Sequence, residues 1–281
     1  MPGDDRLLAV ADLAQGQWGM FTSAQAADTG VSAQYLKRLA DRFLITRMRH
    51  GVYRVAGAPL DPRDPLRAQW LALEPARSAA ERIAGADPVG VVSHRSAAHL
   101  RELGDMDADT YEFIVTKRRN TRSLDVRFHV EAVGRSDWTL VDGLPVTTPT
   151  KTIVDLASSR TDGGHLAGVV WDALRTQQVS REPLAEALRE FAHLYGAPLG
   201  DGDALVEQLI AQASAAQLGP PVPTPDEIGR LQTAARQISS SPQVAAVQDF
   251  SASDQARDVQ RVLRDPAFTE ALRQLRRQGI I

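Results

Sequence analysis

The chain has 281 residues, no cysteine and a formal net charge of −3, and 43% of its residues are hydrophobic. A chain of this length can bury a hydrophobic core in one large domain or in two ordinary ones. The lack of cysteine excludes disulfides, thiolate metal sites and thiol nucleophiles. The sequence contains no run of about 18 apolar residues, and acids stand near its start where a secretory signal carries positive charge. We therefore expect a cytoplasmic protein without a membrane segment.

Basic residues are concentrated in two stretches of this acidic chain. Residues 30–55 contain six basic residues and one acid, a local charge of +5, and residues 117–127 contain five and one, a local charge of +4. The remaining residues must therefore carry a charge of −12. Because a nucleic acid responds to the local distribution of charge, the negative total does not exclude a nucleic-acid partner.

The start of the chain shows the patterns of three short helices. They are expected over residues 5–14, 23–28 and 33–42. Thr22 and Ser32 are suited to cap the second and third helices. Ala26 and Gly30 lie four residues apart, where a small residue lets two helices cross closely and glycine permits a left-handed turn. This spacing predicts a helix-turn-helix.

A β-hairpin is predicted directly after the third helix. The spacing of hydrophobic residues changes from a helical to an alternating pattern in "LITRM" and "VYRV". The segment "RHG" lies between them, with Gly51 available for a positive backbone angle. A hairpin at this place is typical of the wing of a winged helix-turn-helix. We therefore predict a winged helix-turn-helix over residues 1–57.

The predicted third helix leaves hydrogen-bond donors and cations on its outer face. Val31, Leu36 and Leu39 fall where this helix faces the other two, so the polar positions between them remain outside. Such side chains bind base edges and phosphates. We predict DNA contacts from ten residues of the helix and wing: Ser32, Ala33, Gln34, Lys37, Arg38, Arg42, Arg47, Arg49, His50 and Arg54. The alternatives are a solvated face on a protein-binding module and, for Arg42, an interaction with the end of its own helix.

Beyond the proline-rich joint "GAPLDPRDP", the patterns predict a mixed α+β domain over residues 64–217. A long helix is expected first, then a strand that leads into a helix capped by Ser93, two paired strands and two further extended segments. The helices are expected over residues 65–84, 150–158, 164–177, 181–194 and 203–216, and the extended segments are "VGVV", "TYEFIVT", "VRFHVEAV", "WTLVDG" and "LPVTTP". Residues 218–281 are expected to form a proline-rich linker and a helical tail. The predicted fold class is α+β.

The second basic stretch lies between the two paired strands. Its cations are Lys117, Arg118, Arg119 and Arg122. One interpretation is a second contact to a DNA backbone or a site for an acidic partner, and cations that touch phosphates would make binding depend on salt. The alternative is a solvated hairpin loop.

No pattern predicts a catalytic residue, a cofactor or a metal. Ser93 and His94 are neighbours on a predicted helix and do not face each other. His94 and His99 are five residues apart instead of four, and His129 and His165 lack a nearby carboxylate pattern. We therefore expect a protein that is not an enzyme.

Two further kinds of enzyme site lack essential residues. "TDGGHLAG" has neither the lysine of a phosphate-binding loop nor the spacing of a dinucleotide site, so it indicates a turn and a helix cap. Glu112, Asp125 and Glu131 on the strand pair would suit a metal-dependent nuclease, but no Glu-X-Lys follows them. Nuclease activity stays the least favoured alternative.

Four segments together resemble the AbiE-type antitoxins of bacterial toxin–antitoxin and phage-defence operons. The segments are "FTSAQAADTGVSAQYLKRLADRFLITRMRHGVYRVAGAP", "DPLRAQWLAL", "VVSHRSAAHLRELG" and "DWTLVDGLPVTTPTKTIVDLA". The resemblance covers residues 5–215. It implies a winged helix that represses its own operon and a following domain that neutralises a nucleotidyltransferase-like toxin, with DNA contacts within residues 32–54.

The expected partners follow from this resemblance and from the size of one DNA-binding module. They are a double-stranded operator with an inverted repeat, the cognate toxin and a second copy of the chain, as a dimer or as a cooperative pair on DNA. Two alternatives remain open: a protein-binding antitoxin with a structural winged helix, and a plain repressor without a toxin.

Overall fold

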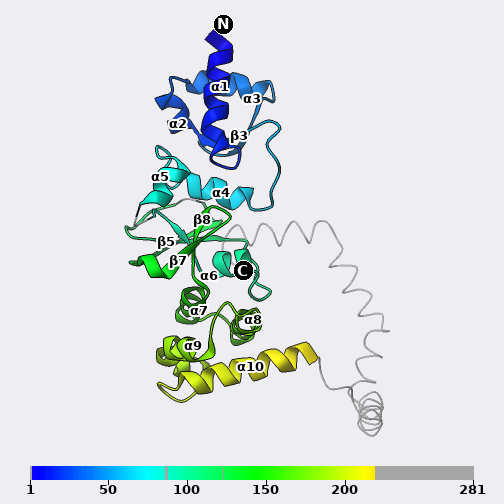
Figure 1. The fold of residues 1–281 in the computed structure, drawn as a ribbon, viewed down its shortest axis with the longest axis vertical. Coiled ribbons are helices and arrows are strands. Elements are labelled where there is room, and N and C mark those ends of the chain that lie inside the picture. Colours follow the sequence, from blue (N-terminus) through cyan, green and yellow to red (C-terminus); the bar gives the residue numbers. More distant parts are fainter. Residues whose placement is uncertain (1, 86–87, 122, 219–281) are drawn as a thin grey trace, which may run out of the picture. The chain divides into compact units, whose positions relative to one another are not determined.

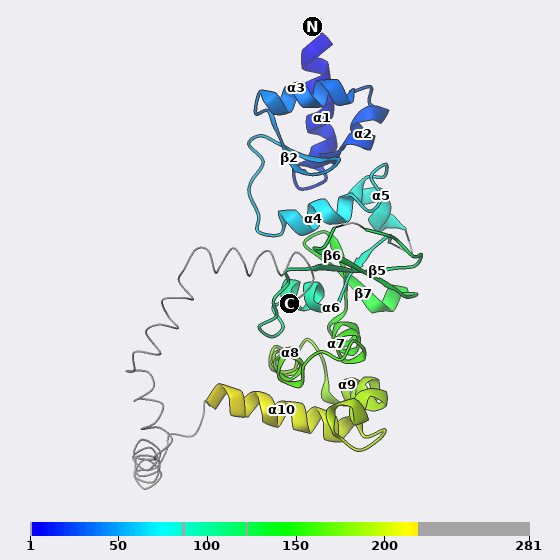
Figure 2. The same ribbon diagram turned by 180° about the vertical axis from the view of Figure 1, so that it is seen from behind.

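The structure is a computed structural model that describes residues 2–85, 88–121 and 123–218. These residues form helices and two β-sheets, one of three strands and one of five (Figures 1 and 2). The predicted α+β class is therefore confirmed. No helix in this part of the chain is long and apolar enough to cross a membrane. The tail expected over residues 218–281 lies, except for Leu218, outside the described residues.

The first sheet and three helices come from the start of the chain. In chain order the elements are α1 (Pro2–Gln15), β1 (Met20–Thr22), α2 (Ser23–Asp28), α3 (Ala33–Asp41), β2 (Ile45–Arg49) and β3 (Val52–Val55). β3 lies between β1 and β2 and pairs antiparallel with both. The hairpin and the three helices agree with the sequence patterns. β1 was not predicted, since three residues are too few to show an alternating pattern.

Local signals fix the ends of α2 and α3. The Thr22 side chain accepts a hydrogen bond from the backbone of Gln25, and the Gln25 side chain accepts one from the backbone of Thr22, which completes a capping box. Gly30 has a φ of 79° in the turn between the helices. Ser32 then caps α3 by accepting from the Tyr35 backbone N–H. The turn and both caps therefore follow from short-range chemistry.

The three-stranded sheet is covered on both faces. Phe21 and Ile45 pack with α1, α2 and α3 in one hydrophobic cluster. Met20 and Val52 point to the opposite face, since neighbouring strand residues alternate, and they pack with Trp70 of the next helix and with the five-stranded sheet. This second cluster holds residues from both sides of the proline-rich joint. The division into domains at the joint stays a prediction.

The single helix predicted over residues 65–84 is wrong. Two helices are present, α4 (Asp64–Leu71) and α5 (Ala79–Ala84). Pro75 lies between them, and proline disfavours helical geometry at the residue before it and supplies no N–H. α5 then starts afresh at a capping box formed by Ser78 and Glu81.

The five-stranded sheet has the order β6-β5-β4-β8-β7. Its strands are β4 (Val91–Val92), β5 (Tyr111–Val115), β6 (Val126–Val130), β7 (Trp138–Val141) and β8 (Leu144–Thr147), and α6 (His94–Leu100) follows β4. A short 3₁₀ helix, Arg135–Asp137, precedes β7. β5 and β6 are neighbours as predicted, but they run parallel, with Tyr111 opposite Val126 and Val115 opposite Val130. The segment between them is therefore a crossover and not a hairpin loop.

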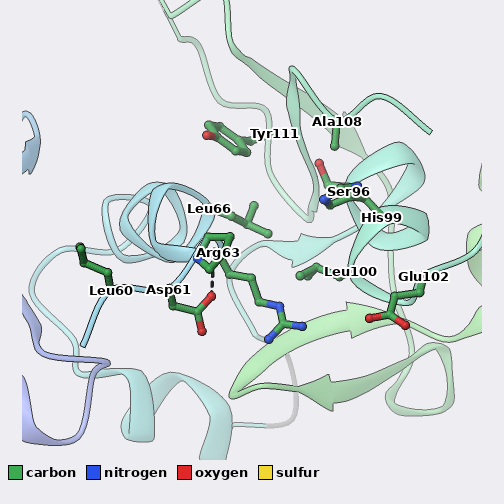
Figure 3. A pocket seen from close by; sticks show the side chains of 11 residues that line it. Leu60, Asp61, Arg63, Leu66, Ser96, His99, Leu100, Glu102, Ala108 and Tyr111 are labelled. Carbon is green, nitrogen blue, oxygen red and sulfur yellow. Dashed lines mark hydrogen bonds between the residues drawn. The ribbon is translucent and has the colours of Figure 1, made fainter. Parts of the chain in front are cut away.

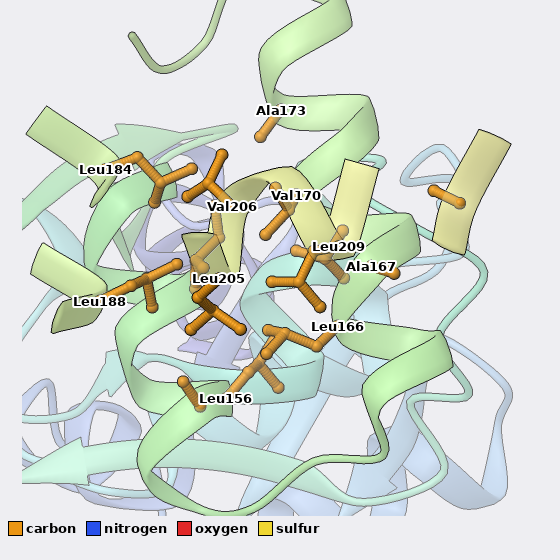
Figure 4. Close-up of a cluster of buried hydrophobic side chains, with 14 of the residues drawn as sticks. Leu156, Leu166, Ala167, Val170, Ala173, Leu184, Leu188, Leu205, Val206 and Leu209 are labelled. Carbon is orange, nitrogen blue, oxygen red and sulfur yellow. The ribbon is translucent and has the colours of Figure 1, made fainter. Parts of the chain in front are cut away.

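Four helices complete the described part of the chain: α7 (Pro149–Ser158), α8 (Gly163–Arg175), α9 (Arg181–Leu188) and α10 (Gly202–Leu218). Their inward faces form an aliphatic core with α6, in which Leu166, Leu184 and Leu205 are fully buried (Figure 4). The predicted cap at "TDGG" is confirmed, because the Asp162 side chain accepts from the backbone of Gly164 and His165. The helix predicted over residues 181–194 changes to a 3₁₀ helix, Arg189–Tyr195, after Leu188.

Candidate nucleic-acid interface

The outer face of α3 is exposed and carries the polar residues predicted for it. Leu36 and Leu39 are buried on the inner face of the helix. The residues predicted to contact DNA from this helix and its ends are all exposed: Ser32, Ala33, Gln34, Lys37, Arg38 and Arg42. The structure therefore exposes these six residues on the part of α3 that faces away from its buried leucines and at the two ends of the helix.

The cations of α3 are not neutralised by neighbouring acids. Lys37, Arg38 and Arg42 form no ion pair with any residue that the structure describes. The Arg38 guanidinium lies 5.4 Å from the centre of the Tyr35 ring, a cation–π contact that leaves its N–H groups for other acceptors. Ser32 uses its side-chain oxygen as an acceptor in the helix cap, and its O–H remains able to donate. The face thus offers donors and positive charge.

The cations of the β2–β3 hairpin divide into two groups. Arg47 and His50 are exposed near the turn and contact each other, with 2.8 Å between Arg47 Nη2 and His50 Nδ1. Arg49 is half-buried, and its Nε and Nη1 have no hydrogen-bond partner among the described residues. Burial lowers the pKa of Arg49, while nearby Asp125 and Tyr111 oppose this shift. Arg49 therefore faces the five-stranded sheet.

Arg54 also faces inward. Its Nη1 lies 3.3 Å from Asp64 Oδ2, and the exposed fractions of the two side chains are 13% and 4%. The same carboxylate pairs with Arg67 at 3.2 Å, and Arg67 pairs with Asp61 at 2.9 Å. The second face of the small sheet packs on α4 and on the five-stranded sheet, which turns Arg54 and part of Arg49 inward. This burial argues against the predicted DNA contacts of Arg49 and Arg54.

The second basic stretch lies on the crossover between β5 and β6. Lys117, Arg118 and Arg119 are exposed, and Arg119 donates a hydrogen bond of 2.5 Å to the backbone oxygen of Leu73. Arg122 lies outside the described residues. These side chains belong to a different part of the fold from α3, and whether they form a second binding site stays a prediction.

A group of titratable side chains lies on the face of β5 and β6 that α6 covers. His129 Nε2 is 2.6 Å from Glu112 Oε2, and the His94 and His129 rings stack with 3.6 Å between their centres. Because β5 and β6 are parallel and Glu112 lies opposite Arg127, Glu112 and His129 are diagonal neighbours on one face. The expectation that His129 has no carboxylate nearby is therefore wrong. Only the parallel register, which the sequence does not show, brings the two together.

Ser93 does not act as the predicted side-chain cap. It precedes α6, but its hydroxyl makes no capping hydrogen bond and instead lies 3.0 Å from His94 Nδ1. His94 takes a φ of 51°, a conformation that is uncommon for residues other than glycine. Burial, with smaller effects of His129, Lys151 and Arg127, lowers the pKa of His94 to about 3. His94 is therefore a neutral imidazole near neutral pH.

A second set of charges, on α7 and directly after β6, adjoins these histidines. Lys151 Nζ lies 2.7 Å from Glu131 Oε1 and also pairs with Asp155. Burial raises the pKa of Asp155 to about 6, although the hydrogen bond from Lys151 opposes this shift. Asp155 Oδ2 is buried and has no hydrogen-bond partner in the described part of the chain.

A cavity of about 610 Å³ lies between the proline-rich joint and α6 (Figure 3). Its lining combines apolar side chains such as Leu66 and Leu100 with polar ones such as His99 and Glu102. Two of its charged residues are already engaged, because Asp61 pairs with Arg67 and Arg63 pairs with Asp142. The cavity lies apart from the exposed face of α3.

The fold and the exposed basic helix together define an α+β protein with a candidate nucleic-acid interface near its N-terminus. Residues 9–56 match the family model described as "Transcriptional regulator, AbiEi antitoxin". The resemblance to AbiE-type antitoxins is confirmed over these residues, and its predicted extent to residue 215 stays a prediction. The match supports an antitoxin or a transcriptional regulator. No curated protein matches the chain in sequence.

Among solved structures, the chain is similar to that of the RV2827C protein from Mycobacterium tuberculosis. The two share 16% sequence identity with a TM-score of 0.45, and the match covers 75% of this chain and 82% of that chain. A similarity of this strength indicates neither a partner nor an activity.

Proposed function

We propose that the chain is a DNA-binding transcriptional autorepressor and antitoxin of a toxin–antitoxin operon. In this proposal residues 1–57 are a winged helix-turn-helix, with α3 as the recognition helix and the β2–β3 hairpin as the wing. The observation that carries the proposal is the outer face of α3, where Lys37, Arg38 and Arg42 are exposed and form no ion pair with a described residue. A helix that keeps unpaired cations on the side opposite its buried leucines is suited to a polyanion.

Recognition would begin with electrostatic capture. The cations displace counterions from the DNA, and α3 then enters a major groove, where Gln34 and Arg38 reach base edges. Glutamine can pair with adenine and arginine with guanine in this groove. One module of this size makes few contacts, so two copies on an inverted repeat supply the specificity.

The hairpin contributes less charge to this interface than its composition suggests. Arg47 and His50 are exposed and can follow the neighbouring DNA backbone. Arg49 and Arg54 face the rest of the chain, so we leave them out of the proposed contact. The DNA contacts proposed from the described structure are Ser32, Ala33, Gln34, Lys37, Arg38, Arg42, Arg47 and His50.

The antitoxin part of the proposal has its support in the family match. The family description contains both activities, and the match covers the unit that holds the basic helix. We assign toxin neutralisation to the α+β domain over residues 64–217, with a nucleotidyltransferase-like toxin as partner. In this proposal the protein acts by binding, in the cytoplasm, and needs no cofactor.

The experiment is a titration of the labelled promoter region of the operon with the full chain at several salt concentrations. Replacement of Lys37 and Arg38 by alanine is expected to weaken binding about tenfold or more, because two candidate phosphate or base contacts are lost. The control variant replaces Arg175 and Arg189, which are 62% and 57% exposed, and so removes the same charge elsewhere. Equal binding by the two variants would contradict the assignment of α3.

A second candidate function is a protein-binding antitoxin in which the winged helix is structural. The inward position of Arg49 and Arg54 favours it, because these cations connect the hairpin to the rest of the chain. Co-expression with the product of the adjacent gene, followed by a test of neutralisation, distinguishes the two candidate functions. The second candidate predicts that the Lys37 and Arg38 double variant still neutralises the toxin and that the wild-type chain does not retain the promoter DNA.

A further inference from the structure

Three potential metal ligands from three elements converge beneath α6. They are His94 at the start of α6, Glu112 on β5 and His129 on β6, and one ligand atom of each lies within 4.8 Å of the others. The set contains two imidazole nitrogens and one carboxylate oxygen. Imidazole nitrogen is preferred by Zn²⁺ and similar transition ions, whereas Mg²⁺ and Ca²⁺ prefer oxygen ligands alone.

The cluster is enclosed but can be reached from solvent. The exposed fraction of His94 is 5% and that of Glu112 is 3%, whereas the His129 side chain is 23% exposed. An ion could therefore enter past His129 and then be held by groups that are shielded from water. Shielding matters because a partly buried site holds a cation more strongly than an exposed one.

The existing hydrogen bonds prepare the two imidazoles for this role. His94 Nδ1 is held by the Ser93 hydroxyl, which leaves Nε2 as the nitrogen available to a ligand. Such a second partner fixes the orientation of a metal-binding histidine. An ion would replace the proton between His129 Nε2 and Glu112 Oε2, and metal–ligand distances near 2 Å require these atoms to separate by less than about 1 Å. The stacked rings must also tilt apart.

Two observations indicate that this cluster does more than fill the interior. His94 has a positive φ of 51°, an uncommon conformation for a residue other than glycine that the surrounding structure must hold in place. Asp155 Oδ2 is buried without a hydrogen-bond partner among the described residues, and Asp155 lies within electrostatic range of His129. A buried carboxylate oxygen without a donor is costly, and a nearby cation would offset that cost.

The surrounding charge also favours a cation. The charged groups that the described structure places around the two histidines are three carboxylates and two cations: Glu112, Glu131, Asp155, Lys151 and Arg127. Lys151 already pairs with Glu131 and Asp155, so it satisfies those two acids only in part.

We propose that His94, Glu112 and His129 bind one divalent transition-metal ion of the Zn²⁺ class. Three protein ligands leave one position of a tetrahedral ion open to water. The ion connects the start of α6 to β5 and β6 and lies beside the Lys151–Asp155 pair of α7. Nothing in the proposed DNA and toxin binding requires it, so this site and the function proposed above can fail separately.

The test is a titration of the full chain with Co²⁺, after tag removal and treatment with a chelator. The wild-type protein is expected to bind one ion per chain with the visible absorption of four-coordinate Co²⁺, and Zn²⁺ is expected to displace it. His94→Gln, Glu112→Gln and His129→Gln should each weaken binding at least about tenfold. The matched control is His99→Gln, which changes an exposed histidine of the same helix and should bind like wild type.

A second measurement does not depend on the folding of variants. X-ray absorption of the Zn²⁺-loaded wild-type chain should show a first shell of nitrogen and oxygen with the scattering pattern of two imidazoles. The proposal is overturned by a wild-type chain without stoichiometric binding, by equal loss in His99→Gln, or by a first shell without histidine. Circular dichroism of each variant shows whether a loss of binding comes from unfolding. Where a variant is unfolded, the X-ray absorption spectrum of the Zn²⁺-loaded wild-type chain decides whether the histidines bind the ion.

Discussion

The outer face of α3 and the interior between α6, β5 and β6 both contain charged or titratable side chains, but in opposite environments. On α3, Lys37 and Arg38 are exposed and have no acidic partner in the described structure. In the interior, Glu112 and Asp155 are buried and lie against His129 and Lys151. Substitutions on the outer face of α3 should therefore alter the proposed DNA binding and leave stability nearly unchanged. Substitutions of the buried charges should lower stability.

The joint between the N-terminal unit and α4 should show the largest effect of a buried charge. Asp64 is 4% exposed in its side chain and pairs with both Arg54 and Arg67. Asp64→Ala leaves two largely buried guanidinium groups without this partner and should lower the free energy of unfolding by about 3–5 kcal/mol. Urea unfolding measures the change. Asp41→Ala, at an exposed position of α3, is the control, and its free energy of unfolding should stay within about 0.5 kcal/mol of wild type.

The interior should also make stability depend on pH. The pKa of His94 is lowered from 6.5 to about 3 by burial, so below pH 6.5 the unfolded chain takes up a proton that the folded chain does not. His94 therefore contributes a loss of stability as the pH falls from 6.5 towards 3, about 2 kcal/mol between pH 7.5 and 5. Asp155 opposes this loss over part of the same range, because its pKa is raised to about 6 and the folded chain takes up that proton before the unfolded chain does. Unfolding in the presence of a chelator measures it. His94→Gln should remove this part of the slope and His99→Gln should keep it.

Under the proposed DNA binding, the hairpin shows whether the exposure of a cation decides its contribution to affinity. Arg47→Ala should reduce the slope of log affinity against log salt by about 0.9, as expected for one lost phosphate contact. Arg49→Ala should leave that slope unchanged, because its guanidinium faces the five-stranded sheet. An equal reduction by both variants would show that Arg49 turns outward when DNA binds.

The smallest effect is expected on the crossover between β5 and β6. Arg119 donates one hydrogen bond to the Leu73 backbone from an exposed position, so Arg119→Ala should lower the free energy of unfolding by less than about 1 kcal/mol. Lys117→Ala, which removes another exposed cation of the same crossover, should leave the unfolding midpoint unchanged. A larger loss for Lys117 than for Arg119 would contradict the structural role of Arg119.

Local sequence determined the N-terminal helices and their ends. A side-chain cap, a glycine turn and a helical spacing of leucines act over four or five residues, so Thr22, Gly30 and Ser32 could be interpreted without knowledge of the fold. The exposed face of α3 follows from the same spacing. The hairpin was also predictable, because its strands are neighbours in the chain.

Tertiary structure decided which charged side chains are buried and which partners they contact. The parallel register of β5 and β6 brings Glu112 to His129 across a crossover, and the packing of the small sheet on α4 turns Arg54 towards Asp64. Neither pairing has a signal in the sequence. Both join different segments of the chain, and the number of residues between two such segments does not determine how they pack. The sequence does not show whether a given arginine or histidine side chain faces water or the protein interior. Only the packed structure shows which side chains are buried.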